Sequence, residues 1–127
     1  MRKKITITYP GKASEEAIIS STSEAEFKRL YSHPCAFSNG WTNMLIQGDN
    51  LFVLKTLIRM KKEGLIKNSD GSAGVRLAYL DPPFSTGAGF KDKDNNKAYG
   101  DKLKGGEFLE FLRKRLVLIR EVLSTDA

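Results

Sequence analysis

The chain has 127 residues and a mass of 14.2 kDa, which is enough for one compact domain and too little for a two-domain enzyme. Hydrophobic residues make up 40% of the chain and charged residues 28%, a balance that excludes a disordered tail. The 21 Lys and Arg against 15 Asp and Glu give a net charge of +6, which favours an anionic partner such as nucleic acid without proving one.

Residues that form disulfides and metal centres are scarce. The chain has one cysteine, Cys35, and one histidine, His33, so we expect no internal disulfide, no metal site and a reducing, cytoplasmic setting. The basic start leads into an alternating segment that stops at Pro10, and no apolar run is long enough to span a bilayer. We therefore expect neither an export signal nor a membrane partner.

Residues 1–43 predict an amino-terminal extension. Alternating apolar residues predict a short strand over 3–9. Ser23 and Glu26 have the spacing of a capping box, which predicts a short helix over 24–31. The polar stretch 32–42 predicts a loop that leads into a larger unit, residues 44–127.

The larger unit begins with an alternation of strand and helix patterns. The apolar run 44–47 predicts a buried strand that stops at Gly48-Asp49-Asn50, and helical periodicity follows from Leu51 to Gly64. A second apolar run, 75–80, predicts another strand. Strand, helix and strand form the βαβ unit of an α/β fold with parallel strands and crossover helices. Ligands of such sheets bind at the carboxyl ends of the strands, where Asp49 and Asp81 fall.

The end of the chain predicts a long loop and a second helix. Residues 84–104 are polar and too many for a simple connector. Residues 107–123 return to helical periodicity, and we expect Arg113, Lys114 and Arg115 on its solvent side. The expected apolar stripe is Phe108, Leu112, Leu116, Ile119 and Leu123. A crossover helix needs a strand after it, and the last four residues are too few, so we expect the fold to be incomplete.

The segment Asp81-Pro82-Pro83-Phe84 is the most specific chemical signal. Two prolines fix φ and remove two amide donors, so the chain turns rigidly and the Pro82 carbonyl can face a cavity. That carbonyl and the Asp81 carboxylate form a pair of acceptors suited to the two hydrogens of a nucleobase amine. Acceptors on these hydrogens stabilise the positive charge that grows on the nitrogen when it attacks an electrophile. Phe84 offers a face on which an extruded base can stack.

These residues resemble the catalytic motif of S-adenosylmethionine-dependent DNA amino-methyltransferases. With the Gly48-Asp49-Asn50 turn upstream, residues 44–123 look like the start of the adenine-specific β-group, which includes modification subunits of type III restriction systems. The resemblance implies a partial Rossmann-like methyltransferase fold. It also implies that Asp81, Pro82 and Pro83 hold the target adenine N6, that Phe84 stacks on the flipped base, and that Asp49 and Asn50 contact the adenosine end of S-adenosylmethionine.

The family's Phe-x-Gly-x-Gly motif, which shapes the methionine end of the cofactor pocket, has no counterpart here. We therefore expect an amino-terminal part of a larger methyltransferase that is inactive alone. Double-stranded DNA is the expected partner, with a restriction subunit or a second copy as further partners. The alternatives are a cytosine-N4 enzyme and a non-catalytic nucleic-acid-binding remnant.

Two assignments have structural alternatives of equal weight. Asp49 also suits the N-cap of the following helix. Lys91 and Lys93 are candidates for DNA phosphate contacts, but Asp92 and Asp94 interleave with them, as in an ordinary solvated loop.

Overall fold

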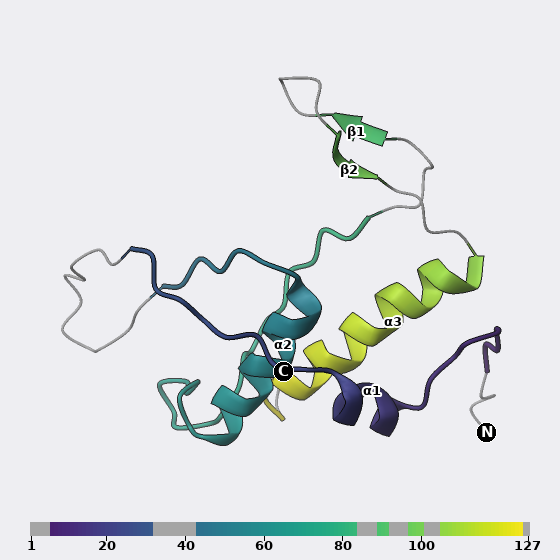
Figure 1. Ribbon diagram of the computed structural model, residues 1–127. Coiled ribbons are helices and arrows are strands. Elements are labelled where there is room, and N and C mark those ends of the chain that lie inside the picture. Colours follow the sequence, from purple (N-terminus) through teal and green to yellow (C-terminus); the bar gives the residue numbers. More distant parts are fainter. Residues whose placement is uncertain (1–5, 32–42, 84–88, 92–96, 101–104, 126–127) are drawn as a thin grey trace.

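The computed structural model describes residues 6–31, 43–83, 89–91, 97–100 and 105–125. Three helices and a hairpin make up its regular structure (Figure 1). The helices are α1 (Glu15–Ser21), α2 (Asn50–Lys62) and α3 (Gly105–Val122). The strands β1 (Gly89–Lys91) and β2 (Lys97–Gly100) pair antiparallel.

Helix α3 is the centre of the packing, and both α1 and α2 lie against it (Figure 1). Ile18 of α1, Ile58 of α2 and Leu118 of α3 are among the buried residues of the core. Val117 and Val122 complete the buried apolar set of the described residues. Since α1 and α2 each bury a single apolar side chain and α3 buries three, polar contacts between the elements contribute much to their relative placement.

A half-buried polar cluster fastens the amino-terminal segment to α3. The Glu110 carboxylate accepts hydrogen bonds from the Tyr9 hydroxyl at 2.7 Å and from the Ala13 amide at 3.2 Å. Arg113 donates to the Ala13 carbonyl at 2.8 Å. The pKa of Glu110 is lowered: burial acts to raise it, but the Tyr9 and Ala13 hydrogen bonds and the Arg113 charge outweigh that effect.

The first helix differs from the prediction. Residues 24–31 are not helical, and α1 forms instead at Glu15–Ser21, where Ser14 caps the helix by accepting from the Ala17 amide at 3.1 Å. The predicted helix is replaced because the hydroxyl of Thr56, on α2, bonds both the amide and the carbonyl of Ala25, at 2.8 and 2.9 Å. The Ala25 carbonyl is a backbone group that a helix over 24–31 would need, whereas the amide of a first-turn residue has no partner within a helix.

The two later helices confirm the periodicity, but the buried face of α3 is not the predicted one. Val117, Leu118 and Val122 are buried, whereas Leu116 of the predicted stripe is 51% exposed. The carboxyl-terminal half of α3 is apolar on two sides, so its spacing alone does not tell which side meets the other helices.

The predicted α/β class with parallel strands is wrong for the described residues, which contain helices and an antiparallel hairpin and no parallel sheet. Segments 44–47 and 76–80 are extended but form no ladder, and Leu45, Leu77 and Tyr79 are almost fully exposed. An apolar run becomes a strand only when a neighbour pairs with its backbone. The sequence pattern indicated that these segments favour burial, and it could not supply the neighbour.

A single parallel bridge joins the start of the second segment to the end of α3. Val75 donates to the Val122 carbonyl at 3.0 Å and accepts from the Ser124 amide at 2.9 Å. Gly74 makes the approach possible, because a Cβ there would lie 2.6 Å from the Val122 oxygen. Lys61 of α2 donates to the Glu121 carbonyl at 2.9 Å and so caps the same helix end. The division of the chain into an amino-terminal extension, residues 1–43, and a larger unit, residues 44–127, stays a prediction.

Candidate functional site

The first predicted site turn lies at the start of α2. Asp49 is the N-cap, and its Oδ1 accepts from the Leu51 amide at 2.9 Å. Asp49 therefore has the structural role that was the alternative to a cofactor contact, which is to cap the following helix. The Asp49 side chain is half exposed, so the carboxylate can also accept hydrogen bonds from a ligand.

The residue that holds this turn is Arg115 of α3. Its Nε donates to Asn50 Oδ1 at 2.6 Å, and its Nη2 donates to Asp49 Oδ1 at 3.1 Å. The guanidinium carbon lies 3.6 Å from the centre of the Phe111 ring. The expectation that Arg115 faces solvent is therefore wrong, since its side chain is only 14% exposed. Its place four residues after Phe111 predicts the contact with that ring, but no local spacing predicts the bonds to Asp49 and Asn50.

Burial and charge act in opposite directions on Arg115. Burial lowers the pKa of the guanidinium, and the Asp49 carboxylate opposes that shift. An arginine starts from so high a pKa that it keeps its charge at neutral pH. The pair is thus a charge-assisted contact between α3 and the turn that precedes α2.

The second predicted site turn follows the extended segment 76–80. Asp81 is exposed, and Pro82 and Pro83 are partly buried. Asp81 makes no hydrogen bond or ion pair with any described residue, and none joins it to the Asp49–Asn50 turn. The Asp81 carboxylate is therefore open to a ligand, and the two turns are related only through the elements that carry them.

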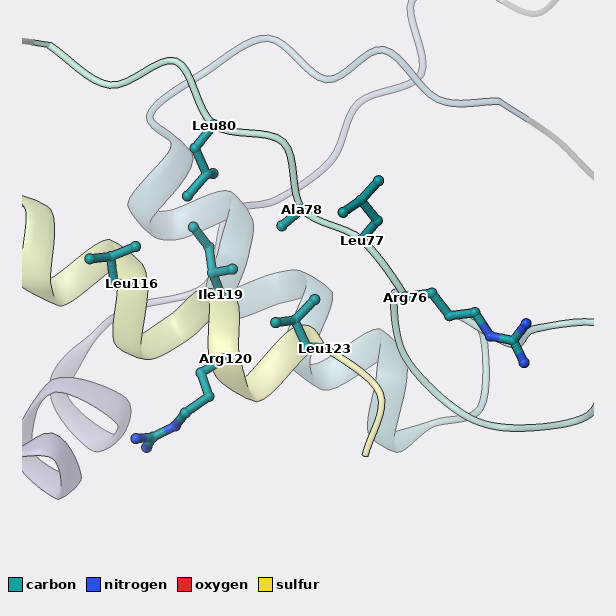
Figure 2. Close-up of a pocket in the computed structure, with 8 residues that line it drawn as sticks. All are labelled: Arg76, Leu77, Ala78, Leu80, Leu116, Ile119, Arg120 and Leu123. Atoms are coloured by element: carbon teal, nitrogen blue, oxygen red, sulfur yellow. The ribbon is translucent and has the colours of Figure 1, made fainter. Parts of the chain in front are cut away.

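The segment leading to Asp81 lies along α3 and forms an apolar groove with it (Figure 2). The groove has a volume of about 370 Å³. Leu80 lies across the groove from Leu116 and Ile119 of α3, whereas the charged ends of Arg76 and Arg120 point away (Figure 2). None of the predicted catalytic residues lines the groove. Its lining suits apolar side chains better than a nucleobase, whose edges need polar partners.

Several predicted site residues lie outside the described part. Phe84 and Lys93 fall there, and Lys91 is described only as a backbone position in β1. Among the described residues, no group of three His, Cys, Asp or Glu side chains could hold a metal ion. None of the described helices is long and apolar enough to cross a membrane.

Comparison with known proteins gives two relatives. Over 97% of its length the chain is 36% identical to the type II methyltransferase M.EcaI of Enterobacter cloacae. Over 66% of its length it is 33% identical to a probable type III restriction-modification enzyme HindVI Mod subunit of Haemophilus influenzae. No family model matches the chain, and no solved structure matches it.

The expected resemblance is confirmed by these relatives: the chain is related in sequence to the methyltransferases of restriction-modification systems. It spans 25% of the length of the Enterobacter protein and 9% of the length of the Haemophilus protein. The similarity therefore concerns one part of each relative.

Proposed function

We propose that this chain forms part of a DNA methyltransferase that transfers a methyl group from S-adenosylmethionine to the N6 amine of a flipped adenine. The observation that carries the proposal is the Asp81-Pro82-Pro83-Phe84 motif, one helix after Gly48-Asp49-Asn50, in a chain 36% identical to a type II methyltransferase. The exposed carboxylate of Asp81 is compatible with this role.

The proposed chemistry rests on acceptors placed around the amine. Asp81 and the Pro82 carbonyl accept the two N6 hydrogens, which draws electron density toward the nitrogen and stabilises the charge that develops there. Pro83 keeps the turn rigid, because its ring fixes the backbone angle. Phe84 stacks on the base that has left the duplex.

The fit of the cofactor to these residues is partial. Asp49 presents a half-exposed carboxylate and Asn50 a side-chain amide at one turn, a donor and acceptor set suited to the hydroxyls and amine of an adenosyl group. The chain has no Phe-x-Gly-x-Gly motif for the methionine end. When bound, S-adenosylmethionine supplies an electrophilic methyl group, and the proposed task of Asp49 and Asn50 is to hold its adenosine end.

The proposed partner is double-stranded DNA, with Lys91 and Lys93 as phosphate contacts and the net charge of +6 as a general attraction. A restriction subunit is a further proposed partner, since one relative is named as the Mod subunit of a restriction-modification enzyme. A cytoplasmic location is consistent with a substrate of this kind. An aspartate at the first motif position favours adenine N6 over cytosine N4.

The test measures transfer of labelled methyl groups to DNA. The chain, and the longer polypeptide if the reading frame continues past Ala127, is incubated with labelled S-adenosylmethionine and duplexes that contain either adenine or hypoxanthine, which lacks the N6 amine. We expect transfer only to the adenine duplex and its loss in Asp81→Asn. Asp70→Asn is the matched control, because Asp70 is also exposed but lies in the turn before Gly74.

Each contrary result has a distinct meaning. If methyl transfer also occurs on the hypoxanthine duplex and depends on the presence of cytosine, the target is cytosine N4 and not adenine N6. Full transfer by Asp81→Asn removes the proposed role of Asp81. Salt-sensitive DNA binding without transfer in either polypeptide favours the non-catalytic nucleic-acid-binding alternative.

A further inference from the structure

Arg115 is held at all three of its guanidinium nitrogens. Nε bonds Asn50 and Nη2 bonds Asp49, while Nη1 donates to the Phe111 carbonyl of its own helix at 3.1 Å. With the Phe111 ring against its face, the group has little freedom to move. A lysine would offer one point charge on a flexible stem and could not bind both turn residues in this planar fork.

These contacts fix one side of the turn and leave the other open. Both donors to Asp49, the Leu51 amide and Arg115, bind Oδ1. Oδ2 has no partner among the described residues, and the side chain is half exposed. The arginine itself is mostly buried beneath the turn. This division leaves one carboxylate oxygen available to a ligand while the other is occupied by the protein.

Helix α3 also supports the second turn. Leu116, the residue after Arg115, lines the groove together with Ala78 and Leu80, which lead to Asp81 (Figure 2). Of two adjacent residues of one helix, Arg115 therefore bonds the first turn and Leu116 lines a groove with the segment that carries the second. A change in the placement of α3 moves both supports together.

We propose that Arg115 is the positioning residue of the cofactor turn: it orients the Asp49 carboxylate and the Asn50 amide and ties them to the helix that supports the Asp81 segment. The inference deepens the proposed function and rests on it for the identity of the ligand. The contacts themselves do not depend on that identity.

The test compares Arg115→Met and Arg115→Lys with Arg113→Met as the matched control. Arg113 is a second partly buried arginine of α3, with partners Ala13 and Glu110, away from the turn. Two quantities are measured on the full chain: the NMR signals of the Leu51 amide and the Asn50 side-chain amide, and the affinity for S-adenosylmethionine. Thermal unfolding of every variant separates positioning from general destabilisation.

We expect both Arg115 variants to shift the Leu51 and Asn50 signals and to weaken S-adenosylmethionine binding by about ten-fold, as for the loss of one charge-assisted contact. Arg115→Lys should do so with little loss of melting temperature, because its stem still packs on Phe111. Arg113→Met should lower the melting temperature and leave the signals and the affinity unchanged.

Unchanged Leu51 and Asn50 signals in Arg115→Met would overturn the inference, whatever the melting temperature. Shifted signals with unchanged affinity would also overturn it, since the turn would then not serve the ligand. If the unaltered chain, and the longer polypeptide where one exists, bind no S-adenosylmethionine, the cofactor assignment in the proposed function fails. The NMR comparison still decides whether Arg115 positions the turn.

Discussion

Replacing Glu110 by alanine should detach the amino-terminal segment from α3. The Glu110 residue is 9% exposed and accepts from the Tyr9 hydroxyl and the Ala13 amide. Its removal leaves these two donors partly buried without an acceptor, at about 1 kcal/mol or more each, and leaves Arg113 without its carboxylate. We therefore expect a loss of about 2–4 kcal/mol in the free energy of unfolding.

The assay is urea unfolding followed by far-ultraviolet circular dichroism at neutral pH, with Tyr9→Phe and the double variant completing a cycle. Tyr9→Phe should cost about 1 kcal/mol, and the double variant should cost less than the sum, because the two groups share one hydrogen bond. An unfolding midpoint for Glu110→Ala that equals that of the unaltered chain would refute the reasoning, since the cluster would then contribute nothing.

The same carboxylate predicts a dependence on pH. The folded pKa of Glu110 lies below its ordinary value of 4.5, so its contribution is present above that value and is lost as the pH falls through the folded pKa. Glu110→Gln should flatten the acid limb of the stability curve. It should not remove it, because the pKa of Glu15 and that of Asp70 are also lowered, by hydrogen bonds from Arg120 and Ser72.

Three further predictions concern the helices and their ends. Gly74→Ala should lower the melting temperature more than Gly71→Ala, because both have positive φ but only Gly74 would bring its Cβ within 2.6 Å of a backbone oxygen. Leu118→Ala should cost about 2–5 kcal/mol in urea unfolding, against less than about 1 kcal/mol for Leu116→Ala, because Leu118 is 0% exposed and Leu116 is 51% exposed. Asp49→Asn should keep the cap and the stability of α2, whereas Asp49→Ala should lose about 1 kcal/mol by the same measure.

The sequence predicted the features that depend on local periodicity. Helices α2 and α3 form where the apolar spacing placed them, and Gly64 follows α2 with a φ of +72°. The strands could not be predicted in the same way, because a strand depends on a neighbour distant in sequence. The segment 24–31 failed for a related reason: its backbone is bound by Thr56, thirty-one positions from Ala25, and no local pattern carries that contact.

The residues of the candidate site also differ in whether a local sequence signal identifies them. The residues of the two turns were recognisable because a rigid Pro-Pro step and a Gly-Asp-Asn break are local signals. Arg115 and Glu110 were not, since each acts across a distance of more than sixty positions in the chain. On a helix, a charged residue that packs against another element has the same spacing as one in solvent.

The basic residues of the described part fall into two groups with different physical roles. Every ion pair described there uses an arginine as the cation: Arg59, Arg76, Arg113, Arg115 and Arg120. An arginine paired with a carboxylate adds little to the long-range positive potential, because two opposite charges a few ångströms apart cancel at larger distances. Salt screens what remains. The proposed attraction for DNA would therefore come mainly from lysines. Lysine replacements should reduce the salt dependence of DNA binding, whereas arginine replacements should act first on the packing of the helices.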